Sequence, residues 1–135
     1  MANGKSDLEE LFLFMLRRYL KKNKIDDITF VRGFRFGADY VGLGPGIKNR
    51  LIAAEVTDSR FDFAFLDNMV GVEIHGGEWI KGGHVTGVGF NRDRRKMNQA
   101  LRLGWKVLEF TGTMLKREPK RCMSDLAILM GWEVL

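Results

Sequence analysis

Two carboxylates near the middle of the chain are spaced so that a β-hairpin sets them side by side. Side chains alternate between the two faces of a strand, and the residue pattern predicts strands at 60–66 and 69–75, joined by a turn at Asp67-Asn68. Asp62 then lies opposite Glu73, with Cβ atoms about 4.5–5.5 Å apart. Two carboxylates this close repel each other unless a cation lies between them. A divalent metal ion is the expected cation, because hard cations take carboxylate oxygens.

The same register predicts which residues share a face. It pairs Ala64 with Gly71 and places His75 next to Glu73 on the carboxylate face. Three aromatic residues share the opposite face: Phe61, Phe63 and Phe65. The alternative interpretation is a solvated surface pair of acids without a function. The facing carboxylates, the adjacent His75 and the following Gly76-Gly77, where a ligand can approach closely, favour a site.

Basic residues form two clusters. The first closes the expected N-terminal helix and contains Arg17, Arg18, Lys21, Lys22 and Lys24. The second follows the hairpin and contains Arg92, Arg94, Arg95, Lys96, Arg102 and Lys106. With 22 basic and 17 acidic residues the net charge is +5, which is compatible with a nucleic-acid partner. Either cluster is also explained by an ordinary solvated helix face, and for the first cluster we prefer that explanation.

The N-terminal half must supply the first helix and an outer strand. Ser6 and Glu9 have the spacing of a capping box, which predicts a helix over 7–22 with Ser6 as its N-cap. Apolar residues at helical spacing mark its expected buried stripe: Leu8, Phe12, Met15, Leu16 and Tyr19. A strand is expected at 28–36, a glycine-rich connection at 37–46 and a short helix at 47–56.

The C-terminal half must supply a helix, a strand and a closing helix. A glycine-rich loop is expected at 78–89, with Trp79, Lys81 and His84 inside it. A helix at 91–103, with Met97, Ala100 and Leu101 toward the core, is expected to end at Gly104. A strand at 105–111 and a helix at 119–130 complete the order α-β-(α)-β-β-α-β-α. The sequence therefore predicts a single α/β domain with a mixed sheet over residues 1–135.

Bulk properties narrow the class of protein. At 135 residues the chain has room for one core. No apolar stretch reaches the roughly 18 residues that cross a bilayer, and the N-terminus lacks the apolar core of a signal peptide. The lone Cys122 rules out an internal disulfide framework and fits a reducing cytoplasm. We expect a cytoplasmic protein in which Cys122 is a packed or surface thiol.

The ordered set of residues resembles a known superfamily. A helix with Glu9, then Asp62, then Glu73-x-His75 on a hairpin, then a helix and a strand, is similar to the PD-(D/E)XK nucleases, which share the restriction-endonuclease core. The segments 92–95 (RDRR) and 103–108 (LGWKVL) resemble very-short-patch mismatch-repair endonucleases. Three segments, 61–64 (FDFA), 72–77 (VEIHGG) and 104–108 (GWKVL), also resemble small endonuclease-like proteins of bacteriophages. The resemblance covers about residues 6–115.

The resemblance implies roles for particular residues. Asp62 takes the place of the metal-binding Asp, and Glu73 takes the first position of the (D/E)XK element. Glu9, or its neighbour Glu10, takes the place of the Glu that several branches carry on the first helix. His75 stands where the superfamily usually has Lys. Which group positions or deprotonates the attacking water is therefore open, and Lys81, His84 and Lys96 are further candidates. Phe61 replaces the Pro that often precedes the Asp. For Glu9 alone, a purely local capping role is the alternative.

The implied activity is metal-dependent DNA cleavage. Mg²⁺, with Mn²⁺ as a substitute, is expected on Asp62, Glu73 and the backbone carbonyl of Ile74, with Glu9 reaching it directly or through water. The expected DNA-contacting residues are Lys81, His84, Arg92, Arg94, Arg95 and Lys96. The side of the helix that carries Arg92, Lys96 and Gln99 is expected to face the DNA. A compact domain without a separate recognition module favours structure-specific cutting of branched, Holliday-junction or mismatched DNA, in a bacterial or phage-infected cell.

Two alternatives to a DNA endonuclease stay open. A non-catalytic nucleic-acid-binding module on a decayed nuclease fold would explain the missing Lys. An RNA-cleaving relative would use the same phosphate-gripping residues. A junction cutter is expected to be a two-fold dimer, because it makes paired incisions.

Overall fold

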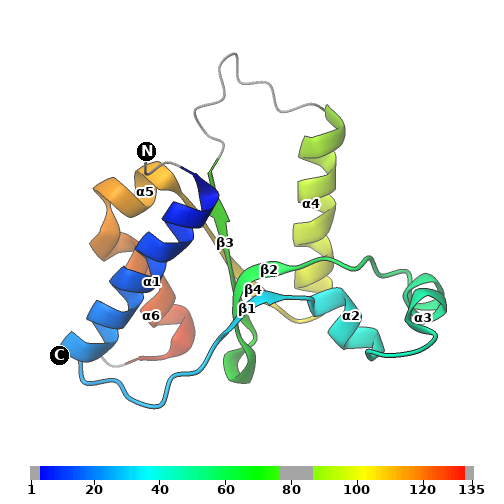
Figure 1. Cartoon of the computed structure of the whole chain (residues 1–135), viewed down its shortest axis with the longest axis horizontal. Helices are drawn as coiled ribbons and strands as arrows, with labels where there is room; N and C mark the ends of the chain where they lie inside the picture. Colours follow the sequence, from blue (N-terminus) through cyan, green and yellow to red (C-terminus); the bar gives the residue numbers. More distant parts are fainter. Residues whose placement is uncertain (1–3, 77–86, 133–135) are drawn as a thin grey trace.

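The computed structural model describes residues 4–76 and 87–132, and within them it contains a four-stranded sheet and six α-helices (Figure 1). The helices are α1 (Lys5–Lys22), α2 (Phe36–Val41), α3 (Ile47–Ala54), α4 (Gly87–Arg102), α5 (Gly112–Arg117) and α6 (Pro119–Met130). The strands are β1 (Val31–Phe34), β2 (Phe61–Phe65), β3 (Val70–His75) and β4 (Lys106–Thr111). The mixed α/β class expected from the sequence is confirmed.

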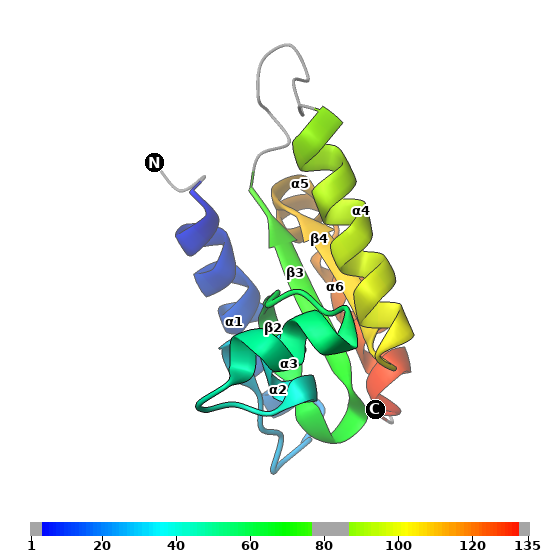
Figure 2. The ribbon, with the colours of Figure 1, turned by 90° about the vertical axis from the view of Figure 1, so that its right-hand side faces the viewer.

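The sheet is flanked by helices on both faces. Its strand order is β1-β2-β3-β4, in which only the β3–β4 pair is parallel. Parallel neighbours need a crossover connection, and α4 lies in it, on one face of the sheet. Helices α1, α5 and α6 cover the other face, as Figures 1 and 2 show from two directions. In the described residues no helix is long and apolar enough to cross a membrane.

The helix α1 buries the stripe that its sequence predicts. Leu8, Phe12 and Leu16 are buried, and Met15 and Tyr19 are partly buried against the same core. The rings of Phe12 and Phe63 lie 4.9 Å apart, so α1 packs directly on β2. This face of the sheet holds the larger of the two hydrophobic clusters.

The hairpin has the predicted register but a different turn. Ala64 pairs with Gly71 and Phe63 pairs with Val72, as expected. Instead of a two-residue Asp-Asn turn, the connection is a short 3-10 helix over Leu66–Asn68. Met69, which follows it, has the left-handed conformation with φ 52°. A longer connection still preserves the register, because the same residues face each other across it.

The expectation that Phe61 shares a face with Phe63 and Phe65 is wrong. Phe61 lies on the α4 face, stacked on Phe36 of α2 with ring centroids 4.0 Å apart. A Cβ on Gly71 would meet the Phe61 ring at 2.7 Å, so only glycine fits there. The pairing between β2 and β3 ends at Phe63, before Asp62. The alternation of faces therefore breaks at Asp62, where β2 leaves the regular ladder.

Several boundaries differ from the sequence-based expectations. Helix α1 begins at Lys5 after Gly4, with no side-chain cap, so the predicted capping box at Ser6 does not form. Only Val31–Phe34 of the expected strand 28–36 is a strand. The expected connection 37–46 contains part of α2, whose Gly37 lies so close to the Thr57 carbonyl that a Cβ would meet it at 1.9 Å.

The C-terminal half follows the prediction more closely. Helix α4 begins at Gly87 instead of 91, and α5 was not expected. Helix α6 has the predicted bounds, and Gly104 ends α4 with φ +95°, as expected for its C′ position. Leu101 is 73 % exposed, which corrects its assignment to the core.

Candidate active site

Asp62 and Glu73 meet at the open end of the hairpin, where β2 and β3 stop pairing through their backbones. The backbone N–H of Asp62 donates to Glu73 Oε2 at 3.0 Å. The backbone N–H of Ile74 donates to Asp62 Oδ2 at 2.7 Å. Each carboxylate thus takes one backbone amide of the neighbouring strand, in place of a ladder bond. These bonds hold the two side chains side by side and leave one oxygen of each for another partner.

Two lysines bind the remaining oxygens. Lys5 Nζ, at the first residue of α1, lies 2.9 Å from Asp62 Oδ1. Lys96 Nζ, from α4, donates to Glu73 Oε1. The two ammonium groups come from helices on opposite faces of the sheet (Figure 2). The carboxylate pair is therefore neutralised from both sides, as two facing carboxylates require.

Burial and charge shift the pKa values of this group. Glu73 is only 5 % exposed, and this desolvation raises the pKa of its carboxyl. Lys96 opposes the increase, and the negative Asp62 adds to it. Burial alone would lower the pKa of Lys5, but its hydrogen bond to Asp62 and the attraction of Asp62, Glu73 and Glu9 raise it. Three carboxylates that were singled out from the sequence therefore act on one ammonium group.

Glu9 faces this cluster instead of capping its own helix. Arg32 of β1 lies 3.2 Å from Glu9 and 3.0 Å from Glu10, and its guanidinium stands over the Phe63 ring. The capping role considered for Glu9 is therefore wrong. Of the two neighbours, Glu9 is the one that acts on Lys5.

His75 forms a second, adjoining cluster. It follows Glu73 on β3, but its Nε2 lies 3.0 Å from Glu109 Oε1 of β4. Arg94 of α4 reaches the same carboxylate at 3.8 Å. Glu109 is the register partner of Glu73 in the parallel β3–β4 pair. In the described residues His75 therefore belongs to a half-exposed group beside the carboxylate pair.

The expected DNA-contacting residues have different surroundings. Lys96 is bound to Glu73, whereas Arg94 lies on Glu109 and over the Phe90 ring at 4.9 Å. Arg92 and Arg95 are exposed on α4. Lys81 and His84, with Trp79, lie outside the described residues.

The expected DNA-facing side of α4 is partly an internal surface. Gln99 had been placed there with Arg92 and Lys96, but its side chain is buried. It accepts from the Thr57 N–H at 2.9 Å and donates to the Thr57 carbonyl at 3.0 Å. Because Lys96 and Gln99 are three residues apart, this side of α4 turns toward the sheet. Gln99 fixes α4 to the segment that leads into β2.

Three residues of the site were not found from the sequence: Lys5, Arg32 and Glu109. Lys5 was placed before the helix, yet it precedes Glu9 by four residues, the spacing that sets two helical side chains on one side. Arg32 and Glu109 are charged residues inside short strands, which is a weak signal without the pairing of those strands. Only the fold brings these side chains to Glu9 and His75.

The carboxylate pair has the donor chemistry of a hard-cation site. Among the described residues no three His, Cys, Asp or Glu side chains form a ready metal cage. Mg²⁺ usually takes only one or two carboxylates together with substrate phosphates and water. Asp62 and Glu73 supply two carboxylates, and the Lys5 ammonium shows that the site holds a positive charge. The Ile74 N–H points at Asp62, and a strand residue directs its N–H and C=O the same way, so its carbonyl faces this gap.

Comparison of the chain with models of known protein families, with curated proteins and with solved structures finds no match in any of the three. The chemistry of the site must therefore be argued from the residues of this chain.

Proposed function

We propose that this protein is a metal-dependent DNA endonuclease with a restriction-endonuclease-like core. The observation that carries the proposal is the pairing of Asp62 and Glu73 where the β2–β3 ladder opens, with lysines on both remaining oxygens. An ordinary solvated acid pair has no reason to interrupt a sheet or to be buried between two helices. Two adjacent carboxylates at such a position suit a divalent cation, which is usually bound through one or two carboxylates together with phosphate and water oxygens.

In this proposal the chain's carboxylates hold the metal. Asp62 and Glu73 would hold Mg²⁺ with the Ile74 carbonyl, and Glu9 would complete the acidic surroundings. When bound, Mg²⁺ lowers the pKa of a water and offsets the charge that develops on the scissile phosphate. Lys5 would give up Asp62 to such a cation and turn to the solvent or to a phosphate oxygen, since its side chain is half exposed.

Lys96 is better placed than His75 to act as the lysine of the (D/E)XK element. Its ammonium group already lies on Glu73, whereas His75 lies on Glu109. An ammonium group beside the attacked phosphate orients the water and stabilises negative charge in the transition state. The role left open by the Glu73-x-His75 spacing is thus assigned to a residue of α4.

The exposed side of α4 is the proposed DNA track. Arg92, Arg94 and Arg95 precede Lys96 on α4 and are exposed, and side chains of this kind grip phosphates without reading sequence. Branched or mismatched DNA is the proposed substrate class, because none of the described elements forms a separate recognition module.

A second candidate function is a non-catalytic nucleic-acid-binding module. One observation favours it: both carboxylates are already neutralised by lysines, and Lys96 is largely buried on Glu73. A decayed site would be stable in this form without a metal.

One experiment separates the two candidates. Labelled duplex, flap, mismatch and four-way junction DNA are incubated with the protein in Mg²⁺, in Mn²⁺ and in EDTA, and a matched RNA duplex is included. A nuclease cuts at least one DNA with metal and none with EDTA. Binding without cleavage under all conditions would establish the module instead, and cleavage of RNA alone would identify the RNA-cleaving relative.

A further inference from the structure

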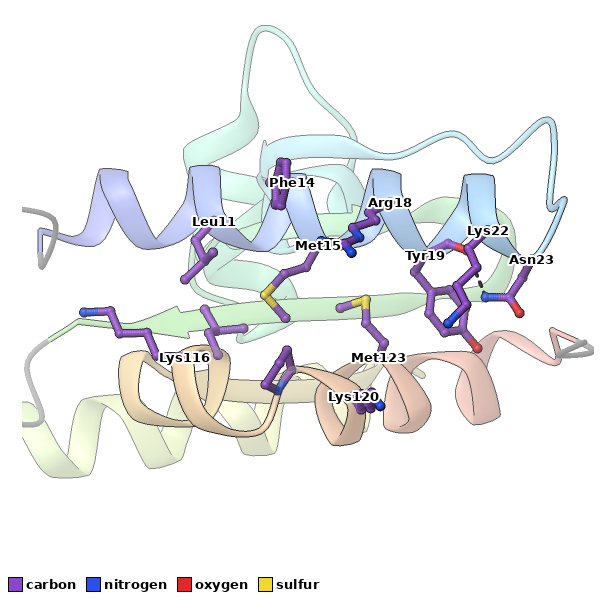
Figure 3. Close-up of a pocket in the computed structure, with 12 residues that line it drawn as sticks. Leu11, Phe14, Met15, Arg18, Tyr19, Lys22, Asn23, Lys116, Lys120 and Met123 are labelled. Carbon is purple, nitrogen blue, oxygen red and sulfur yellow. Dashed lines mark hydrogen bonds between the residues drawn. The ribbon is translucent and has the colours of Figure 1, made fainter.

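A groove lies between α1 and the α5–α6 pair, on the face of the sheet away from α4. Its volume is about 800 Å³, within the range of about 300–1,000 Å³ that binding pockets have. Figure 3 shows its lining side chains, with Met15 of α1 and Met123 of α6 pointing toward one another across the floor. It contains none of the residues assigned to the candidate active site.

The floor of the groove is apolar and adaptable. Leu11 and Met15 come from α1, and Leu115 and Met123 from the opposite side. Phe14, which also lines it, is 61 % exposed, an unusual position for a large aromatic side chain. Methionines suit a surface that adjusts to a bound partner, because their side chains are flexible and polarisable.

The rim of the groove is basic on both sides. Arg18 and Lys22 stand one turn apart on α1, while Lys116 and Lys120 stand on α5 and α6. None of the lining residues is acidic. In the part of the chain that the structure describes, Arg18, Lys22 and Lys120 form no ion pair. Two rows of positive charge thus border an apolar strip.

We propose that this groove binds an acidic amphipathic helix of a partner protein. Such a helix places a narrow apolar stripe on the floor and its acidic residues against both rows of cations, the known helix-in-groove mode of recognition. The stretch from Leu11 to Asn23 is about 18 Å long at 1.5 Å per residue, which accommodates about three turns. A long apolar stripe with flanking acids fills the groove along its whole length.

Charge and surface chemistry argue against other occupants. DNA would meet the cations, but it would leave the apolar floor without a matching surface. A second copy of this chain is basic overall, at +5, and would bring like charge to the rim. The sequence-based preference for an ordinary solvated face at Arg18 and Lys22 does not explain the apolar strip between the two rows.

The test uses a designed probe, a fluorescein-labelled peptide of about 15 residues. Leucines at helical spacing form its stripe, and glutamates flank them. A matched peptide carries lysine at every glutamate position. Fluorescence anisotropy with the full-length protein is expected to show saturable binding of the acidic peptide, weakened by salt, and at least about tenfold weaker binding of the lysine peptide.

Charge reversal gives the decisive variant. Arg18→Glu/Lys120→Glu replaces two exposed cations, one on each wall, and is expected to weaken the acidic peptide at least about tenfold and to strengthen the lysine peptide. The matched control Lys48→Glu/Lys106→Glu changes the net charge equally at exposed positions outside the groove, and it is expected to bind as the parent does. Phe14→Ser, at another exposed position, is expected to weaken the binding of both peptides.

Several results would overturn the proposal. One is the absence of saturable binding of the acidic peptide, and another is equal weakening of that binding in the control variant. A third is that the Arg18→Glu/Lys120→Glu variant loses binding of duplex DNA although the parent does not bind the peptide. A concentration-dependent dimer that Phe14→Ser abolishes would identify a second copy as the occupant. Saturable binding of laurate with no binding of peptide would identify an anionic amphiphile. Nuclease activity is not a readout here, so failure leaves the proposed function untouched.

Discussion

The two faces of the sheet are built for different purposes. The face under α1, α5 and α6 is a continuous apolar core of fifteen buried residues, from Leu8 to Met130. The face under α4 has a smaller cluster of five, around Phe61 and Trp105, and then becomes polar. Three polar or charged residues are buried in the described part of the chain, and two of them, Glu73 and Gln99, lie on this second face. One face therefore buries most of the apolar side chains, whereas the other also holds buried charge.

The largest effect is expected from Asp62→Asn. The change keeps the shape of the side chain but removes the negative charge that binds a cation, so cleavage of any DNA that the parent cuts should fall at least about 10³-fold, or about 4 kcal/mol. Cleavage rates in Mg²⁺ measure it. Asp67→Asn, at the other end of the same hairpin, is the matched control and should keep full activity. If Asp62→Asn protein turns over normally, the metal assignment is wrong.

The apolar face should respond in the opposite manner. Phe63→Ala removes a ring that is fully buried against Phe12 and Phe30, and it should lower the free energy of unfolding by about 3–5 kcal/mol. Urea denaturation followed by Trp fluorescence measures the loss. Phe14→Ala, on the exposed side of α1, is the control and should stay within about 0.5 kcal/mol of the parent. A small effect at Phe63 would contradict the division of roles between the faces.

The sequence predicts the apolar face better than the polar one for a physical reason. The stripe of α1 and the bounds of α6 follow from hydrophobic periodicity, which is a local signal. The position of Asp62 opposite Glu73 follows from the hairpin register, which is also local. The partners of those carboxylates do not follow from either. Lys5 and Lys96 are about ninety residues apart in the sequence, and only the packing of α1 and α4 on opposite faces brings them to one site.

Several wrong sequence-based predictions concern the polar face. Phe61 breaks the period-two pattern because β2 leaves the ladder at Asp62. Leu101 was placed in the core and Gln99 outside it, and the structure reverses them. A helix whose inner side carries Lys96 and Gln99 cannot be oriented by hydrophobicity alone, since its buried polar groups are satisfied by Glu73 and Thr57.

The third prediction concerns the buried ion pair. Lys96→Met leaves the buried Glu73 carboxylate without its ammonium partner and should cost about 1–3 kcal/mol of stability at neutral pH. Lys96 opposes the upward shift of the Glu73 pKa, so its removal raises that pKa further. A carboxyl whose pKa is higher in the folded state loses stability as pH rises through that value, and regains it as pH falls.

The deficit of Lys96→Met should therefore shrink toward acid pH, as Glu73 takes up a proton. Urea denaturation of parent and variant between neutral and mildly acid pH measures it. Lys106→Met, an exposed lysine on β4, is the control and should show no pH-dependent difference. The double variant Glu73→Gln/Lys96→Met should recover most of the loss, because no unpaired charge stays buried. A deficit that is constant with pH would show that Lys96 stabilises the fold by packing alone.

The smallest effect is expected at the edge of the polar face, from His75→Ala. His75 lies on Glu109 in a half-exposed pair beside the metal-binding carboxylates, so removal of its side chain should lower the cleavage rate by no more than about tenfold. A general base in direct contact with the attacking water would cost about 10²–10⁴-fold instead. The measurement is the cleavage rate of His75→Ala, Glu109→Gln and the double variant on the same DNA. If the two residues act as one group, the double variant loses no more than His75→Ala alone. If His75→Ala loses several hundredfold in cleavage rate while Lys96→Met stays active, His75 takes the role of the lysine in the (D/E)XK element. The catalytic part of the α4 face would then extend to the end of β3.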